Sequence, residues 1–130
     1  YRIYMEVMRR CLRQGGRFLL HTIGGFESAN HIDPWMNRYI FPNAVLPSQK
    51  QIVRAAEGLF AVDGWQSIGR HYDRTLLEWR ANFERDCTRG QHGFDERFRR
   101  MWRYYLSASA ASFRARHTDV WQVLFVPLPG

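Results

Sequence analysis

His21 is the residue whose type and position most directly allow binding or catalysis. It follows the apolar run 18–20, which is predicted to be a strand, so it lies near the carboxyl end of that strand. Open α/β sheets place their ligands at the carboxyl ends of their strands. Taken alone, however, a hydrogen-bonded histidine at the edge of a core is the simpler interpretation. Tyr72, at the start of a predicted helix, is likewise most simply an aromatic residue that packs there.

Positive charge in this sequence is carried almost entirely by arginine. The chain has 19 Lys and Arg residues against 12 Asp and Glu residues, a formal net charge of +7, and Lys50 is its only lysine. The planar guanidinium fork suits phosphate and carboxylate groups. This charge favours a polyanionic partner, which composition leaves open as nucleic acid, an anionic membrane or a phosphorylated substrate.

Four of the arginines gather between residues 97 and 103. They are Arg97, Arg99, Arg100 and Arg103. A solvated helix face is the simplest interpretation, and a surface for phospholipid headgroups formed by Arg97, Arg100 and Arg103 is the more specific one. Arginine interleaved with Trp and Tyr also suits RNA. The sequence has no RNP-like, KH or helix-turn-helix pattern, so no specific nucleic-acid partner is expected.

Several classes of site and segment are not predicted. The five histidines and two cysteines lack the spacing of a structural zinc site. We find no Walker motif, no Gly-x-Ser-x-Gly and no glycine-rich phosphate loop between a strand and a helix. The sequence shows no apolar run of membrane-spanning length and no signal-peptide pattern. Two cysteines exclude a disulfide framework, and we expect Cys11 and Cys87 to be reduced and buried.

The pattern of elements favours an α/β fold. Hydrophobic residues make up 45% and aromatic residues 15% of the 130 residues, which excludes a disordered chain and predicts a single domain at 1–130. The predicted order is helix, strand, helix, helix, strand, helix, helix, strand, with strands at about 17–23, 59–68 and 119–126. The run 18–20 is continuously apolar, as in a strand covered on both faces.

Local signals place the helices. Asp33 followed by Pro34 predicts the start of a short helix, and Ser48 with Gln51 has the spacing of a capping box. Apolar stripes predict helices at 1–12 (Ile3, Val7, Met8, Cys11, Leu12), 72–87 (Leu76, Trp79, Phe83, Cys87) and 94–116 (Phe94, Phe98, Met101, Tyr105, Phe113). The third stripe is most simply core, and an acyl-chain channel lined by part of it is the second interpretation.

Three groups of segments together carry a resemblance to a known family. They are residues 12–24 with Leu-His-Thr-Ile at 20–23; residues 33–48 with Asp-Pro-Trp, Tyr-Ile-Phe-Pro-Asn and Leu-Pro-Ser; and residues 72–76, Tyr-Asp-Arg-Thr-Leu, with 104–106, 113–116 and 121–123. This ensemble resembles the C-terminal part of cyclopropane-fatty-acyl-phospholipid synthase and of its relatives that modify mycolic acids. It covers nearly the whole chain.

The resemblance implies the C-terminal half of a Rossmann-like class I S-adenosylmethionine-dependent methyltransferase fold with a helical lid insertion. The strand at 119–126 should lie between the other two and run antiparallel to the first. The first four strands, the glycine-rich cofactor loop and the acidic ribose-binding residue of the family should lie upstream, so we expect this chain to be a C-terminal fragment. It should then expose one sheet edge and an apolar face and should self-associate.

The resemblance also implies a reaction and its residues. The family transfers a methylene group from S-adenosylmethionine to a cis double bond of a phospholipid acyl chain, with bicarbonate as the base. The residues that correspond to its bicarbonate ligands here are His21, the backbone N–H of Ile23, and Tyr72; a Cys and a Glu would come from upstream. The chain departs from the family pattern at 109–112, which reads Ser-Ala-Ala-Ser, and at Ala44, changes that we expect to alter packing more than chemistry.

We therefore expect part of a cyclopropane-fatty-acyl-phospholipid synthase, cytoplasmic and peripheral to the inner face of the membrane, that acts on membrane phospholipid. No cofactor-binding or metal-binding residue is assigned in this chain, and the isolated chain should be inactive. The alternatives left open are an inactive truncated remnant, a related fatty-acid C-methyltransferase, and a basic module that binds an anionic membrane or RNA.

Overall fold

A computed structural model of the chain describes residues 1–90 and 93–129. Their elements follow the predicted order: α1 (Arg2–Cys11), β1 (Phe18–Gly25), α2 (Pro34–Tyr39), α3 (Gln49–Ala56), β2 (Phe60–Ser67), α4 (Gly69–Thr88), α5 (Glu96–Arg114) and β3 (Thr118–Pro127). The predicted caps are present. Asp33 accepts from the backbone N–H groups of Trp35 and Met36, and Ser48 forms a reciprocal capping box with Gln51.

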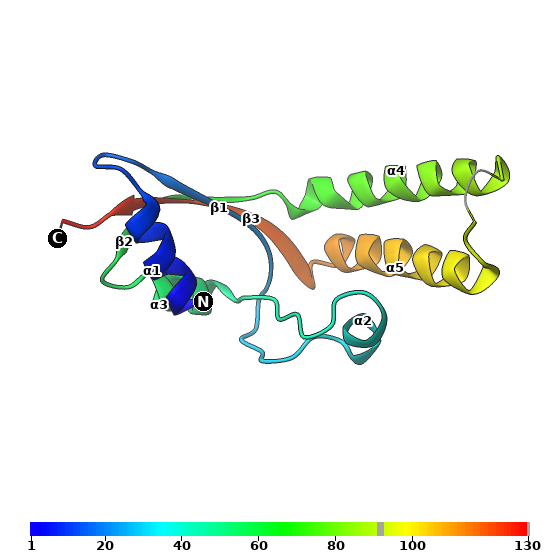
Figure 1. Cartoon of the computed structure of the whole chain (residues 1–130), viewed down its shortest axis with the longest axis horizontal. Coiled ribbons are helices and arrows are strands. Elements are labelled where there is room, and N and C mark those ends of the chain that lie inside the picture. The colour runs from blue at the N-terminus through cyan, green and yellow to red at the C-terminus, as the bar shows by residue number, and fades with distance from the viewer. Residues whose placement is uncertain (91–92, 130) are drawn as a thin grey trace.

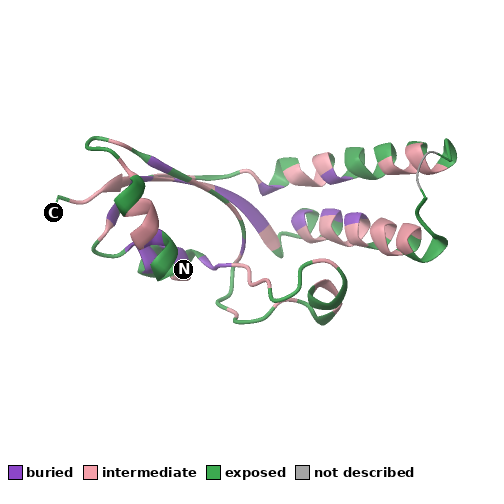
Figure 2. Cartoon of the chain, in the orientation of Figure 1, coloured by how far each residue is buried: buried purple, intermediate pink, exposed green. Residues whose placement is uncertain are grey.

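The three strands form one sheet in the order β1-β3-β2, with both pairings antiparallel. The prediction that the last strand lies between the other two is thus confirmed. Phe18 lies opposite Phe125 and Ile23 opposite Val120, while β2 joins the other side of β3 with a bulge between Val62 and Gly64. The central strand β3 is the most buried of the three (Figure 2).

One face of the sheet packs against α1 and α3, which lie on the same side of it in Figure 1. The core there is aromatic: the rings of Phe18, Phe60 and Phe125 have centroids 5.6–5.8 Å apart. Met5 of α1 and Ile52 of α3 complete it. This apolar layer fixes β1 in register and therefore fixes the direction in which its other face points.

Helices α4 and α5 form an antiparallel hairpin that projects from one end of the sheet (Figure 1). A second buried cluster joins them to β3 and consists of Leu76, Leu106, Ala110, Phe113 and Val120. Two bidentate ion pairs cross the hairpin, Arg114–Asp73 near the sheet and Arg103–Glu84 farther out. None of the described helices has the length and apolar character required to span a bilayer.

The expectations about burial on α1 and at Cys87 were wrong in part. In α1 the packed side chains are Met5, Met8 and Leu12, so Ile3 is exposed and so is Cys11. Cys87 is only partly buried. Met8 and Leu12 of the predicted stripe do pack as expected, but the position of α3 and the sheet turns the buried side of α1 toward Met5 and away from Ile3 and Cys11.

The first strand is covered on one face, not on both. Phe18 is buried, whereas the next side chain, Leu19, is 56% exposed because it points away from α1 and α3. Within the described residues β1 also has β3 as its only strand neighbour. The expected open sheet edge is therefore present, and the apolar side chain of Leu19 beside it is exposed.

Candidate functional site

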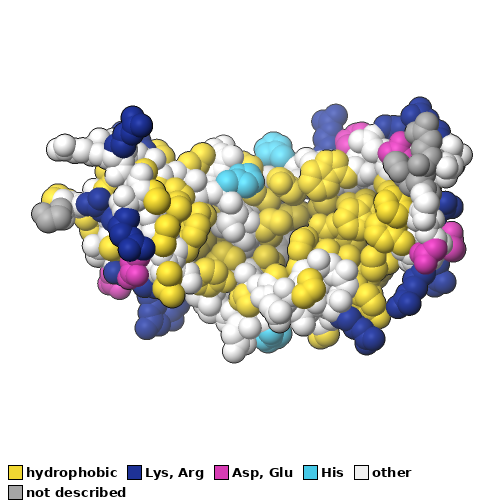
Figure 3. Space-filling view, in the orientation of Figure 1, with side chains coloured by type: hydrophobic (Ala, Val, Ile, Leu, Met, Phe, Trp, Pro, Cys, Tyr) yellow, Lys and Arg dark blue, Asp and Glu magenta, His cyan; other side chains and the backbone are white. Residues whose placement is uncertain are grey.

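An apolar cavity of about 250 Å³ lies where the end of β1 meets α2, its following loop and the α4–α5 hairpin. We call it the acyl cavity, after the chain that the family resemblance would place there. Its wall consists of Ile23, Ile32, Met36, Phe41, Leu46, Tyr72, Leu76, Trp79, Tyr105, Ser109, Ser112, Phe113 and Thr118. In Figure 3 hydrophobic side chains gather over α2 and the hairpin, whereas arginines lie mainly toward the two ends of the molecule. Part of the predicted helical stripe, Tyr105 and Phe113, thus lines a cavity.

Tyr72 lies in the first turns of α4 and is held by rings on both sides. Its ring centroid is 5.4 Å from that of Phe113 and 6.4 Å from that of Trp79. The next residue, Asp73, accepts two hydrogen bonds from Arg114, at 3.0 and 3.1 Å. This fork ties the start of α4 to the end of α5, so it helps to keep Tyr72 on the cavity wall.

The backbone N–H of Ile23 points away from β3, toward the open edge of β1. Opposite Ile23, the Val120 carbonyl accepts instead from Ile68 on the β2 side, at 2.8 Å. A strand residue directs its N–H and C=O to the same side, so Ile23 and Val120 form a non-hydrogen-bonded pair. Two residues on, the N–H of Gly25 donates across the same open edge to the carbonyl of Pro47, at 3.0 Å.

His21 lies on the same face of β1 as Ile23 but is not part of the cavity wall. Its side chain is exposed, and its Nδ1 is 3.3 Å from the amide nitrogen of Gln122 on the paired strand. If that amide donates to Nδ1, the proton of the neutral ring lies on Nε2, which is then a free donor. The structure thus places Ile23 and Tyr72 on one cavity and His21 beside it, and the convergence of all three on an anion stays a prediction.

A second tyrosine, Tyr105, was not singled out as a site residue from the sequence. It lines the acyl cavity with Tyr72, and burial, followed by the proximity of Tyr72, raises the pKa of its phenol. Its ring contacts Phe41 at 5.9 Å between centroids. Its place in the apolar stripe on 94–116 was the available signal, but that signal did not distinguish a cavity wall from packed core.

The buried carboxylate of Asp119 was also missed. Its Oδ1 accepts from the N–H groups of Gly69 and Val120, both at 2.8 Å, and its Oδ2 accepts from the Ser67 hydroxyl at 2.5 Å. Burial raises the pKa of this carboxyl, but the hydrogen bonds that it accepts outweigh burial and lower the pKa overall. Asp119 thus fixes the start of α4 at Gly69, which lies three residues before Tyr72 in the chain.

Two glycines near the cavity are required by close packing. A Cβ on Gly24 would lie 2.0 Å from the ring of Trp121, and a Cβ on Gly69 would lie 2.2 Å from Oδ1 of Asp119. The Gly that follows the Leu-His-Thr-Ile motif therefore allows the tryptophan of β3 to pack directly on β1. Side chains are excluded at both positions by rigid neighbours.

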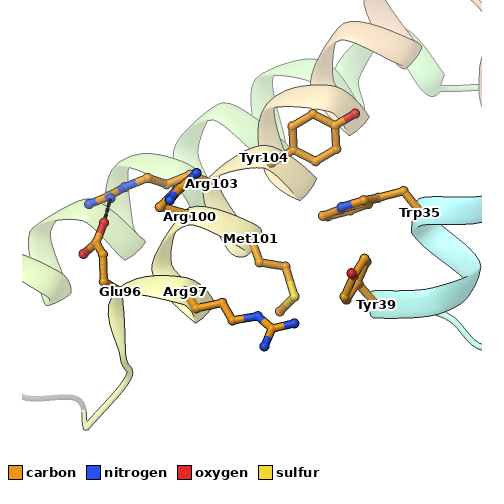
Figure 4. A pocket seen from close by; sticks show the side chains of 8 residues that line it. All are labelled: Trp35, Tyr39, Glu96, Arg97, Arg100, Met101, Arg103 and Tyr104. Carbon is orange, nitrogen blue, oxygen red and sulfur yellow. Dashed lines mark ion pairs between the residues drawn. The ribbon is translucent and has the colours of Figure 1, made fainter.

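The arginines predicted to form a headgroup surface line a second, larger pocket between α2 and α5. We call it the α2–α5 pocket, and its volume is about 750 Å³. Its wall consists of Trp35, Tyr39, Glu96, Arg97, Arg100, Met101, Arg103 and Tyr104 (Figure 4). The structure therefore brings Arg97, Arg100 and Arg103 together and adds three aromatic rings that sequence analysis did not connect with them.

No cluster of three or more His, Cys, Asp or Glu side chains suited to a metal ion occurs among residues 1–90 and 93–129. The chemistry available at the acyl cavity is that of an apolar chamber with two phenols. The open backbone edge of β1 and the exposed imidazole of His21 lie beside it. Such a chamber can exclude water from an acyl chain, and its donors can bind a small anion at one end.

Comparison with known proteins gives a consistent result. A family model described as mycolic acid cyclopropane synthetase matches residues 1–123. The chain is 44% identical over 125 residues to the cyclopropane-fatty-acyl-phospholipid synthase of Escherichia coli (strain K12), covering 96% of this chain and 33% of that protein. It is 35% identical over 127 residues to tuberculostearic acid methyltransferase UfaA1 of Mycobacterium tuberculosis, and the match covers 92% of this chain and 30% of that protein. The chain thus spans about a third of the length of each of these relatives.

Solved structures agree on the fold. Mycolic acid cyclopropane synthase CmaA1, complexed with SAH and CTAB, matches with a TM-score of 0.83 at 26% identity, covering 96% of this chain and 49% of that one. Cyclopropane synthase MmaA2 from Mycobacterium tuberculosis matches with a TM-score of 0.85 at 22% identity, and the match covers 95% of this chain and 48% of that one. The predicted α/β methyltransferase architecture is confirmed.

Proposed function

Because the chain belongs to the mycolic acid cyclopropane synthetase family, we propose that it is part of a cyclopropane-fatty-acyl-phospholipid synthase. Such an enzyme transfers a methylene group from S-adenosylmethionine to a cis double bond of a phospholipid acyl chain. The observation that carries the proposal is the position of Ile23 and Tyr72 on one apolar cavity beside an open strand edge.

The acyl cavity suits the intermediate of this reaction. Methyl addition to an alkene leaves a carbocation on the chain, and water would trap it. The cavity wall is largely aliphatic and aromatic, and the hairpin packs on it from one side and α2 from the other. Phenol rings such as those of Tyr72 and Tyr105 also present π-faces, which attract a cation.

Ring closure then needs a base for one proton of the added methyl group. Bicarbonate, bound at the cavity, would supply a weakly basic oxygen for that proton. The residues of this chain fit such an anion: the Ile23 N–H is directed away from β3, Tyr72 lies on the same cavity, and His21 is on the same strand face. Their role is to bind and orient the anion. We assign no residue of this chain to S-adenosylmethionine, because its sequence has no glycine-rich loop between a strand and a helix.

The test is to join this chain to the upstream part of the Escherichia coli relative and to express the fusion in cells that lack the synthase. Cyclopropane fatty acids are then measured by gas chromatography of membrane lipids. Tyr72→Phe and His21→Gln should each lower turnover by about 100-fold, the usual cost of one anion-stabilising donor. Tyr4→Phe is the matched control, since it removes an exposed phenol on α1, away from the cavity. Parent-level ring formation in both site variants would remove these residues from the mechanism.

A related fatty-acid C-methyltransferase is the second candidate, and the 35% identity to tuberculostearic acid methyltransferase UfaA1 favours it. Both candidates begin with methyl transfer to an alkene, and they differ in whether a ring or a methyl branch results. The same lipid analysis separates them, because a methyl-branched product without a ring would select the second candidate.

The substrate class implies a place of action and a partner. We propose that the enzyme works at a membrane surface from the cytoplasmic side and takes phospholipid directly from the bilayer. The formal net charge of +7 supports attraction to an anionic membrane. For the isolated chain we propose self-association through the open edge of β1 and the exposed side chain of Leu19.

A further inference from the structure

We propose that the α2–α5 pocket binds the phosphate of an anionic membrane lipid, with Arg97 and Arg100 as the phosphate ligands. The proposal deepens the function above, on which it rests, by naming where the protein recognises the lipid headgroup. It assigns different roles to the three clustered arginines, which sequence analysis grouped together.

Arg103 is already neutralised by carboxylates of its own chain. Its guanidinium donates to both carboxylate oxygens of Glu84, at 2.8 and 2.9 Å, and lies 3.7 Å from Glu96. The hydrogen bonds from Arg103 in turn lower the pKa of Glu84. Since its fork is occupied, Arg103 acts as a hairpin clamp at the back of the pocket and not as a phosphate ligand.

Arg97 and Arg100 have no such partner. Within the part of the chain that the structure describes, neither forms an ion pair, and both are exposed at the pocket. Figure 4 shows Arg97 extending below Met101 toward Tyr39, so its guanidinium lies at the pocket, where it is accessible to a ligand from solvent. Two unpaired guanidinium groups one helical turn apart on α5 suit a phosphate.

The opposite wall of the pocket is aromatic. Trp35 of α2 contacts Tyr104 of α5 at 4.5 Å between ring centroids and Tyr39 at 5.5 Å. Trp and Tyr are the residues that collect at membrane–water interfaces, where one side of the ring is apolar and the other is wet. A pocket that joins arginine forks to such rings fits a headgroup at a bilayer surface better than it fits a soluble phosphate.

The pocket also adjoins the acyl cavity. Trp35 and Tyr104 line the α2–α5 pocket, while their sequence neighbours Met36 and Tyr105 line the acyl cavity. The same two helices therefore present a charged, aromatic chamber beside an apolar one. A phospholipid has the same arrangement of a phosphate beside apolar chains, and this match favours a lipid over RNA.

The test measures binding to vesicles of dimyristoyl phosphatidylglycerol against dimyristoyl phosphatidylcholine by co-sedimentation. Both lipids are saturated, so neither can be a substrate, and the result does not depend on whether ring formation occurs. Each arginine near an anionic surface strengthens binding by about fivefold. Arg97→Gln/Arg100→Gln should therefore weaken binding to the anionic vesicles by about 30-fold. Arg103→Gln should change binding to the anionic vesicles by less than about threefold.

The control variant is Arg10→Gln/Arg13→Gln. These two arginines are exposed, form no ion pair among the described residues, and lie in and after α1, at the other end of the molecule. Both double variants lower the formal net charge by two, from +7 to +5. Arg97→Lys/Arg100→Lys should restore much of the binding, because it restores the two positive charges at the same positions.

Four results would overturn the proposal. They are equal weakening by the two Gln pairs, no preference for the anionic vesicles, parent-level binding by Arg97→Gln/Arg100→Gln, and full displacement from vesicles by millimolar inorganic phosphate. The last would mean that the pocket takes a free phosphate. Tighter, Arg97-dependent binding to single-stranded RNA than to the vesicles would also reject the lipid.

Discussion

Removal of the Asp119 carboxylate should destabilise this protein more than the loss of an ordinary surface hydrogen bond. In Asp119→Ala the buried N–H groups of Gly69 and Val120 lose their acceptor, whereas the exposed Ser67 hydroxyl can bind water. A buried donor without an acceptor costs about 2 kcal/mol, so the two N–H groups together cost about 4 kcal/mol. For a chain of this length that loss lowers the melting temperature by about 15 °C.

Asp119→Asn is the matched variant. Its Oδ1 can still accept from both N–H groups, and its amide can donate to the Ser67 hydroxyl, so geometry is kept and the charge is lost. Since hydrogen bonds to a charged group are the stronger kind, the expected loss is about 1 kcal/mol. The measurement is thermal unfolding followed by circular dichroism, with the three proteins compared at neutral pH.

The pH dependence of the difference tests the same reasoning. The pKa of Asp119 is lower in the folded protein than in the unfolded chain. Its charge therefore stabilises the fold fully above the unfolded pKa of about 3.9, and this contribution disappears as the pH falls through the lower folded pKa. The melting temperatures of the parent and Asp119→Asn should thus converge at acidic pH. An Asp119→Ala variant that melts within about 2 °C of the parent would refute the argument.

Three further results are expected. Gly24→Ala should destabilise the fold by about 3 kcal/mol in chemical denaturation, because its Cβ would lie 2.0 Å from the Trp121 ring, and an unchanged midpoint would contradict that contact. The isolated chain should show no binding of S-adenosylmethionine in calorimetry, since its sequence has no glycine-rich cofactor loop, and micromolar affinity would show that this view of the chain is wrong. Light scattering at high concentration should show self-association that Leu19→Lys reduces, because Leu19 is 56% exposed beside an open strand edge, and a monomeric parent would count against it.

Much of the fold was predictable because its signals are local. The Asp33 cap, the capping box at Ser48 and the apolar run at 18–20 depend on residues a few positions apart, and the two caps and the strand formed where expected, although the strand is covered on one face only. The strand order came from the family resemblance, not from periodicity. On α1, periodicity identified Met8 and Leu12 but missed Met5, because only the position of α3 and the sheet decides which side is buried.

The candidate site was predictable only in part. Residue type and motif pointed to His21 and Tyr72, but the cavity also depends on Tyr105, and the start of α4 depends on Asp119, which is 50 residues from its partner Gly69. Such long-range pairs leave no local pattern in a single sequence. The arginine cluster was visible, yet its partition into a neutralised Arg103 and two unpaired neighbours required the position of Glu84 on the other helix.

The charge, the helix and strand signals, and the motifs that mark the family can all be derived from the sequence alone. Which side chains share a chamber depends on how the elements pack. Pairing of β1 with β3 directs the Ile23 N–H outward, and packing of α4 on α5 brings Tyr72 to the same cavity. The physical reason is that caps and periodicity act over one or two helical turns, whereas a cavity forms from residues whose separation along the chain carries no such constraint.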